Sequence, residues 1–418
     1  MLKTYKYRLY PTNGQKEKLD WTLEMCRILY NSCLVDRNRH YESTGKGLSR
    51  MTQQKILVRD KKNIEYLTNI HSQVLQDVLF RVEKAYKAFF RRIKDKNGKA
   101  GYPRFKNYGR YDSITYTQSG FGIDDTGKLS LSKIGHIKLK LHRNISGIIK
   151  TCSIKKEIDK WYACFSVEYK PIERPIPDKQ IGIDIGINPF VALSDGKQID
   201  NPKYLIKSEE RLIRKQRRLS CKKKGSNNRK KAITVVAKAH KKVSNQRKDF
   251  QHKLSREIVD NYGVIAVEDL QIRNMVKNHN LAKSINDAGW GQFFSFLTYK
   301  AEEAGCYVEK VNPRYTSKTC LACGYIYKDM TLAIRNWTCP VCNTVHDRNI
   351  NAAGNIINKK IRQICSRMFI KAKPLCPTKW PKFTPEEISS MDDPSYSNIA
   401  ALKSTLSLNR EAPPERKG

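Results

Sequence analysis

The amino-acid sequence predicts an α+β protein with several domains. Its 418 residues are about two to three domains' worth of chain. Segments with the apolar period of a helix alternate with short strand-like runs. A paired cysteine motif near residues 320–342 adds a small metal-binding module. These three observations lead to the multidomain α+β class.

Charge is the most unusual property of this chain. Lysine and arginine number 80 against 40 acidic residues, a formal net charge of +40. Such a charge attracts polyanions, and nucleic acid is the favoured partner. A membrane surface fits less well, because the sequence has neither the roughly 20-residue apolar run of a span nor a lipidation motif. The first segment, MLKTYKYRLY, carries charges where a signal peptide is apolar, so we expect a cytoplasmic protein.

The first 175 residues predict one strand, a helical region and a group of short strands. KTYKYRLYP alternates and ends at Pro11, as a strand does. From Gly14 to about Arg92 the pattern is helical, with Trp21 and Cys26 on its apolar face. A turn-rich basic linker with interspersed aromatic residues covers 94–110. The runs after it, such as SITYTQ and KWYACFSVEY, suggest a small β-barrel.

A proline-rich stretch, PIERPIPDKQ, predicts a domain boundary before the second half of the chain. IGIDIGINPFVALSDGKQI reads as a two-stranded hairpin, and residues 206–256 as a densely basic helical hairpin. NYGVIAVEDL and YVEKVNP are predicted strands, and NDAGWGQFFSFLTYKAEEAG and DRNINAAGNIINKKIRQI are predicted helices. Residues 371–418 are rich in proline, serine and charge and are predicted to form a flexible tail.

Four cysteines form the strongest single motif. Two C-x-x-C pairs are separated by 15 residues: Cys320, Cys323, Cys339 and Cys342. This spacing is typical of a zinc ribbon, in which four thiolates enclose Zn²⁺ tetrahedrally. Because no coordination position stays open for water, we expect a structural zinc ion.

Three acids suggest chemistry beside this module. Asp184 lies inside an apolar strand, Glu268 ends another, and Asp347 precedes the last helix. Each alone has an ordinary explanation: a satisfied core acid, the end of a strand, or a helix N-cap. If the strands are neighbours, however, the three carboxylates converge and need cations among them. Mg²⁺ takes such oxygen ligands, and two ions about 4 Å apart support phosphodiester cleavage.

The order IGIDIG, AVED and a cysteine module running into HDRNINAAGNI resembles the TnpB family. These are RuvC-like, RNA-guided endonucleases of insertion sequences and apparent ancestors of type V CRISPR effectors. KYRLYPT, YKAFFRR, GYPRFK, DAGWGQF, YTSKTC and RNWTCPVC also look like family segments, so the resemblance covers most of the chain before about residue 371.

The resemblance implies an arrangement of domains. Residues 178–318 and 344–370 would form an RNase H-like RuvC nuclease, with a zinc ribbon at 319–343 inserted before the last acid. Residues 1–10 and 100–175 would form a wedge-like β-barrel, and 11–99 a helical recognition domain. Asp184, Glu268 and Asp347 would be the catalytic, Mg²⁺-binding residues. The family often has a further acid where this chain has Asn349.

The resemblance also implies the activity and its partners. A monomer would carry a guide RNA and cleave target double-stranded DNA beside a short flanking motif, in a prokaryotic cytoplasm at the nucleoid. The basic hairpin would face guide RNA or heteroduplex. Gln76, Thr117, Gln118 and Ser119 would contact the DNA, and the alternative is that they are ordinary polar surface residues. Arg335 would contact the substrate strand or pack on Trp337. The alternatives are a guided binder without cleavage, a strand-joining transposase, and a zinc-ribbon nucleic-acid-binding protein with incidental acids.

Overall fold

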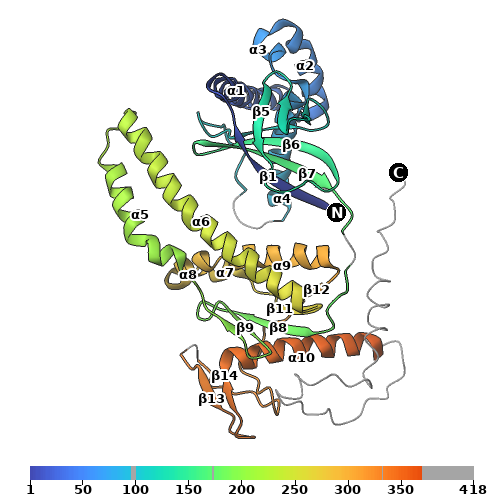
Figure 1. Ribbon diagram of the computed structural model, residues 1–418, viewed down its shortest axis with the longest axis vertical. Helices are drawn as coiled ribbons and strands as arrows, with labels where there is room; N and C mark the ends of the chain where they lie inside the picture. The colour runs from blue at the N-terminus through green and yellow to red at the C-terminus, as the bar shows by residue number, and fades with distance from the viewer. Residues whose placement is uncertain (96–99, 172–173, 332, 370–418) are drawn as a thin grey trace. The chain divides into compact units, whose positions relative to one another are not determined.

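The computed structural model describes residues 1–95, 100–171, 174–331 and 333–369. The predicted tail, 371–418, lies outside this described part. The chain separates into two compact units, Met1–Lys170 and Pro171–Gly418 (Figure 1). Each unit combines a β-sheet with helices, so the combination of helices and strands in more than one unit that the sequence predicts is confirmed.

An antiparallel sheet organises the first unit. Its seven strands follow the order β2-β6-β7-β1-β5-β4-β3, so the first residues of the chain lie in the middle of strands that follow residue 112. The strands are β1 (Leu2–Tyr10), β2 (Ser113–Tyr116), β3 (Phe121–Ile123), β4 (Lys128–Leu131), β5 (Gly135–Lys140), β6 (Ile148–Glu157) and β7 (Lys160–Glu168). Tyr5, Tyr7 and Leu9 are buried alternately along β1, because successive side chains of a strand point to opposite faces.

Four helices complete this unit: α1 (Asn13–Thr44), α2 (Arg50–Asn63), α3 (Glu65–Thr68) and α4 (Ser72–Lys94). Thr12 and Gln15 form a capping box that starts α1. Leu19, Leu23 and Cys26 are buried one helical turn apart, as predicted. The prediction for Trp21 was wrong: the residue is 39% exposed, because its position falls on the opposite side of the same helix.

A five-stranded sheet organises the second unit, in the order β10-β9-β8-β11-β12. Strands β8 (Gln180–Ile185), β11 (Val264–Glu268) and β12 (Tyr307–Val311) are parallel, whereas β9 (Val191–Leu193) and β10 (Gln198–Ile199) form an antiparallel meander with β8. The predicted hairpin is therefore confirmed, with one additional short strand.

Helices cover both faces of this sheet. The predicted basic hairpin is present as α5 (Tyr204–Ser220) and α6 (Asn227–Asn261), and is followed by α7 (Ile272–Met275), α8 (His279–Ala288) and α9 (Trp290–Ala304). Figure 1 shows α6 and α9 on one face and α10 (Arg348–Phe369) on the other. Burial on both faces explains why β8 and β11 are almost wholly apolar.

Gly182 allows α10 to lie directly on β8. A Cβ atom at this position would stand 2.0 Å from the carbonyl oxygen of Ala353 in α10. No side chain fits there, so the glycine of IGIDIG sets the distance between the helix and the strand. The helix can thereby present its first turn to the end of that strand.

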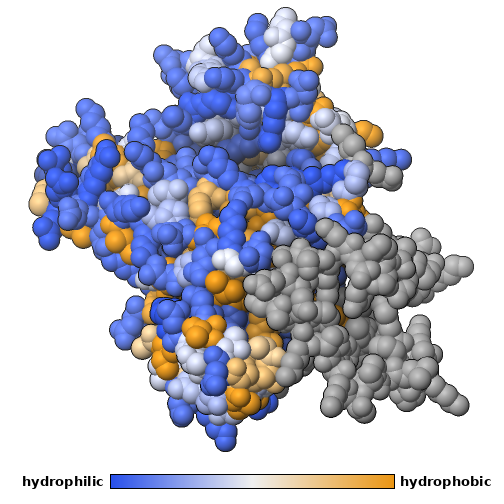
Figure 2. Space-filling model, turned by 60° about the horizontal axis from the view of Figure 1, so that its bottom comes forward, coloured by the Kyte–Doolittle hydropathy of each residue, from blue (hydrophilic) through white to orange (hydrophobic). Residues whose placement is uncertain are grey.

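Hydrophilic residues cover most of the face shown in Figure 2, apart from the residues drawn in grey. Among the helices of the described part, none combines the length and apolarity that crossing a membrane requires.

Candidate active site and metal centre

Asp184 and Glu268 lie next to each other at the carboxyl ends of neighbouring parallel strands. In the register of β8 and β11, Ile183 pairs with Val267, so the residues that follow them stand side by side. Glu268 is 8% exposed, and Asp184 is partly buried. The carboxyl edge of a parallel sheet is where ligand sites commonly form.

Asp347 joins this edge from the other side of the sheet. It ends the short strand β14 (Val345–Asp347), which pairs with β13 (Asn336–Thr338). Its Oδ1 accepts hydrogen bonds from the backbone nitrogens of Asn349 (2.8 Å) and Ile350 (3.0 Å). Asp347 therefore caps the N-terminus of α10, as one of its predicted roles required, and the cap also fixes the direction of its carboxylate.

Electrostatic interactions connect Asp184 with the other two acids. Burial, together with the charges of Glu268 and Asp347, raises the pKa of Asp184 to about 8, while Arg348 opposes the shift. Burial also raises the pKa of Glu268, against the opposing effects of Thr316 and Lys359. Asp184 thus lies beside Glu268 and within electrostatic range of Asp347, and a cation near these carboxylates would relieve their repulsion.

Thr316 was missed by the sequence reasoning and orients Glu268. The threonine is 2% exposed, and its hydroxyl donates a hydrogen bond to Glu268 Oε1 at 2.5 Å. The same hydroxyl lies 3.0 Å from the carbonyl oxygen of Pro313, so two acceptors compete for one proton. The nearest sequence signal was the segment YTSKTC, which contains this residue.

Two asparagines of α10 hold the segment that contains Thr316. Asn355 Nδ2 donates to the carbonyl oxygens of Thr316 (2.9 Å) and Thr319 (2.6 Å), and Asn351 Nδ2 donates to Thr319 as well (2.8 Å). Asn351 Oδ1 accepts from the backbone nitrogen of Leu321 at 2.9 Å. Their spacing of four residues places both amides on one face of the helix. The same spacing of Asn351 and Asn355 is present in the sequence NINAAGNI.

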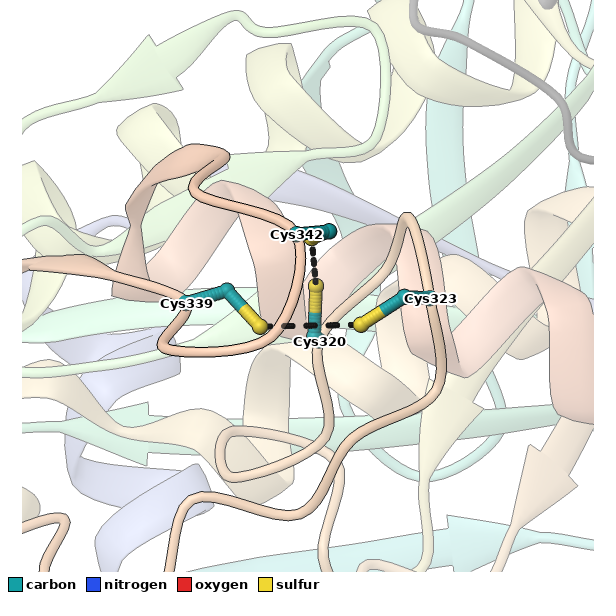
Figure 3. A group of neighbouring side chains, drawn as sticks. All are labelled: Cys320, Cys323, Cys339 and Cys342. Carbon is teal, nitrogen blue, oxygen red and sulfur yellow. Dashed lines mark hydrogen bonds between the residues drawn. The ribbon is translucent and has the colours of Figure 1, made fainter.

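The four predicted zinc ligands form one cluster. Their sulfur atoms all lie within 4.8 Å of one another and point toward a common centre (Figure 3). Cys320 and Cys342 are 3.6 Å apart, as measured between Sγ atoms, and Cys323 and Cys339 are 3.5 Å apart. Four sulfur donors at this separation suit tetrahedral Zn²⁺. Hydrogen bonds from Thr344 lower the pKa of Cys342 to about 6, which favours the thiolate that a metal needs.

His346 links the cysteine cluster to the acids. Its Nε2 atom lies 3.0 Å from Cys320 Sγ, and both residues are buried. Its ring packs on Trp337, which in turn stacks on Tyr327. Since side chains alternate along a strand, His346 faces the cysteines while the next residue, Asp347, faces the other way.

The remaining predicted contact residues have these positions. Thr117 Oγ1 and the backbone nitrogens of Gln118 and Ser119 all donate to Gln73 Oε1, so this loop is tied to the start of α4. Gln76 is three residues further along that helix and lines a small groove between α2 and α4. Arg335 is exposed, and its backbone oxygen accepts from Arg348, beside the acids.

Three segments of the chain match known protein families. Residues 164–279 match the family described as "Probable transposase", 290–356 the "Cas12f1-like, TNB domain", and 1–46 a "Helix-turn-helix domain". A Streptomyces pristinaespiralis protein named "Putative RNA-guided DNA endonuclease" is 34% identical over 363 residues, 85% of this chain and 88% of that one.

Two further similarities extend over most of the chain. The Escherichia coli K12 protein named "Putative RNA-guided DNA endonuclease InsQ" is 29% identical over 395 residues, 90% of this chain and 96% of that one. Among solved structures, a Cas12f1 chain from a complex with single-guide RNA and target DNA matches with a TM-score of 0.56 and 13% identity, over 86% of this chain and 99% of that chain.

The fold and the site together define a mixed α/β protein in which a four-cysteine cluster adjoins a group of three carboxylates. By its similarity to the Streptomyces protein over most of both lengths, the chain belongs to the TnpB family.

Proposed function

We propose that this protein is an RNA-guided DNA endonuclease of a transposable element. The observation that carries the proposal is the register of β8 and β11, which places Asp184 beside Glu268 at the carboxyl edge of the sheet. At that position burial, and after it the charges of Glu268 and Asp347, raise the pKa of Asp184. A carboxylate cluster of this kind beside a zinc-type cysteine module occurs here in a family whose relatives are named as guided endonucleases. Guide RNA and target DNA are the proposed partners, and the charge of +40 suits both.

The nuclease half would have an RNase H-like RuvC fold. Support comes from the strand order β10-β9-β8-β11-β12, with an antiparallel meander followed by parallel strands. Residues 178–318 and 344–370 would form this domain and 319–343 its zinc ribbon. In the other half, residues 1–10 and 100–175 would form the wedge-like barrel and 11–99 the recognition domain.

Asp184, Glu268 and Asp347 would hold Mg²⁺, for which their oxygen donors and unneutralised charge are suited. When bound, two such ions activate water and stabilise charge on the leaving oxygen of a phosphodiester. For its part, the chain keeps Asp184 protonated up to about pH 8 when no cation is present. Thr316 directs one oxygen of Glu268, and the first turn of α10 directs one oxygen of Asp347.

The nucleic-acid contacts are proposed by position. Arg335 lies beside Arg348 and hence near the acids, where it would contact the phosphates of the strand to be cut. Gln76 and the loop Thr117–Ser119 meet the same end of α4 and would read the flanking motif by amides and hydroxyls. The basic hairpin of α5 and α6 would follow the backbone of the guide or the heteroduplex.

The proposal is tested with purified protein, the RNA that copurifies with it, matching duplex DNA and Mg²⁺. Cutting of the matched duplex, lost in Asp184→Ala with RNA binding retained, is the expected result. A stable complex without cutting would favour the alternative of a guided, repressor-like DNA binder without cleavage. Joined DNA strands would favour the strand-joining transposase. If Asp184→Ala leaves every activity intact, the protein is a zinc-ribbon binder with incidental acids.

A further inference from the structure

Residues 100–112, which connect α4 to β2 in the chain, are hydrogen-bonded along α1. Tyr102 donates its hydroxyl to Asn38 Oδ1 at 2.8 Å. Four residues later, the backbone of Lys106 is bonded by Asn31 and Arg27: its nitrogen donates to Asn31 Oδ1 (2.8 Å), and its oxygen accepts from both side chains. Asn38, Asn31 and Arg27 lie on one stripe of α1. Asn38 and Asn31 are about 10.5 Å apart along the helix axis, so the two anchor points of the segment are separated by about two turns of α1.

Aromatic rings of α4 support the start of this segment. The ring of Tyr102 meets the rings of Tyr86 (centroids 5.6 Å apart) and Phe89 (5.1 Å) edge to face, and Phe90 packs on Phe89 at 5.2 Å. Tyr86 also donates to Asn38, at 3.1 Å. The rings are therefore held in place before any partner arrives, and rigid aromatic groups lose little conformational entropy on binding.

Four rings of this region nevertheless remain exposed. Phe90 is 60% exposed, Tyr102 49%, Phe105 53% and Tyr108 84%. We call these four residues the aromatic strip. Single exposed apolar residues are common, but four exposed rings at the end of α4 and on one short segment that is hydrogen-bonded to α1 indicate a binding site.

The charges around the aromatic strip select the partner. Arg91, Lys94, Arg104, Lys106 and Arg110 are all exposed, and Asp95 is the one acid within the described residues of 87–110. A protein partner would need an acidic, ring-binding surface, whereas a nucleic acid with unpaired bases supplies phosphates and flat rings together. In duplexes the bases are already stacked, so the rings would add nothing to their binding.

We propose that the aromatic strip binds unstacked bases in a single-stranded part of the guide RNA. The surrounding arginine and lysine side chains would contact the phosphates of the same RNA strand. This surface deepens the proposed function and rests on it for the identity of the RNA. The aromatic strip lies wholly within the first unit, whereas the three acids belong to the second.

The test measures binding by the full chain, freed of copurified RNA and without Mg²⁺. The probes are a uridine 12-mer, a thymidine 12-mer and a 12-base-pair RNA duplex. Tyr108→Leu and Phe105→Leu should each weaken uridine binding by about 10-fold and leave duplex binding unchanged, because one stacking contact is lost. Trp21 is an exposed ring of α1 outside the stripe of Arg27, Asn31 and Asn38, so Trp21→Leu is the matched control and should change neither.

Two outcomes would overturn the proposal. Unchanged uridine binding, or an equal loss for the duplex, would show that the rings do not stack on bases. A loss confined to the thymidine probe would assign the surface to a DNA strand instead of RNA. Since the assay involves no cleavage, its failure leaves the nuclease proposal intact, and an inactive nuclease leaves the assay readable.

Discussion

His346 Nε2 lies 3.0 Å from Cys320 Sγ, and the residue that follows this histidine is Asp347. Burial lowers the pKa of His346, which favours the neutral ring. A neutral ring with its proton on Nε2 donates that N–H to the sulfur. Donors to a metal-bound thiolate stabilise its charge and orientation. The cysteine cluster and the third acid are thereby connected through one strand of three residues, β14.

His346→Ala should weaken zinc retention. Loss of a partner to a metal ligand typically reduces metal affinity about 10- to 100-fold. Zinc release to a chelator should accelerate, and His346→Gln, which keeps an N–H donor, should restore part of the retention. His279→Ala, at an exposed histidine, is the control. Identical release rates in all three variants would show that the contact does not support the metal.

Asp184→Asn should stabilise the metal-free protein, increasingly so at higher pH. The folded-state pKa of about 8 lies above the unfolded value near 3.8, so the folded protein holds a proton that the unfolded chain releases between these values. The free energy of unfolding of the wild type therefore falls as pH rises from about 4 to 8. The variant should not show this fall, so near pH 8 it should be more stable than the wild type by about 1–2 kcal/mol, a value that allows for relaxation of the site and for entry of water.

Thermal unfolding at several pH values, with and without Mg²⁺, measures the effect. Mg²⁺ should raise the melting temperature of the wild type near pH 8 but not that of Asp184→Asn. Asp200→Asn, at an exposed carboxyl of the same unit, should follow the wild type. A stability difference that does not change with pH would refute the shifted titration of Asp184.

Thr316→Val should impair the use of Mg²⁺ through Glu268. The change removes the hydroxyl that donates to Glu268 Oε1, and an unsatisfied buried acceptor costs about 1–3 kcal/mol. Because that hydrogen bond lowers the pKa of Glu268, its loss raises the pKa further. Half-maximal cleavage should then require more Mg²⁺, by about 5- to 10-fold if roughly 1 kcal/mol is expressed in binding.

Two companion variants make this measurement specific. Thr316→Ser keeps the hydroxyl and should titrate with Mg²⁺ like the wild type. Thr338→Val, at an exposed threonine of β13, should have no effect. Equal Mg²⁺ dependence for Thr316→Val and the wild type would remove Thr316 from the account of the site.

Gly182→Ala should destabilise the second unit by about 3 kcal/mol or more, at or above the upper end of the usual overpacking cost. The added methyl group would meet the Ala353 carbonyl at 2.0 Å, and backbone cannot move aside as a flexible side chain can. Urea denaturation measures the loss. Gly122→Ala, in a strand where nothing lies within 4 Å of the added Cβ, should be nearly neutral. Equal stabilities of Gly182→Ala and Gly122→Ala would disprove the close contact at Gly182.

Nucleic-acid binding should depend steeply on salt because of the net charge of +40. With many phosphate contacts, affinity should fall by roughly 10³-fold or more between about 50 and 200 mM salt. Binding titrations with the copurified RNA give the slope. A nearly flat dependence would mean that backbone contacts do not dominate the interaction.

Features set by neighbouring residues were predictable from the sequence. The helical period identified α1 and α4, and alternation identified β1 and the strands after residue 112. Two C-x-x-C pairs separated by 15 residues predict a compact cluster of Cys320, Cys323, Cys339 and Cys342, and the structure contains this cluster. The N-cap position of Asp347 was likewise visible, because capping is decided within one helical turn.

Other features depended on contacts between distant parts of the chain. Trp21 has the composition of a core residue but the wrong angular position on α1. Thr316, Asn355 and His346 are ordinary polar residues in sequence, and their importance comes from the acids, carbonyls and sulfur that tertiary packing places beside them.

By itself, the sequence determined the helices and strands, the cysteine cluster and the three acids as candidates, since local spacing and chemistry encode these. Only the tertiary structure decided that Asp184, Glu268 and Asp347 share one electrostatic environment. That environment arises from the parallel register of β8 with β11 and from α10 lying against Gly182. Both are long-range pairings, whose energy depends on surfaces that do not exist until the chain has folded.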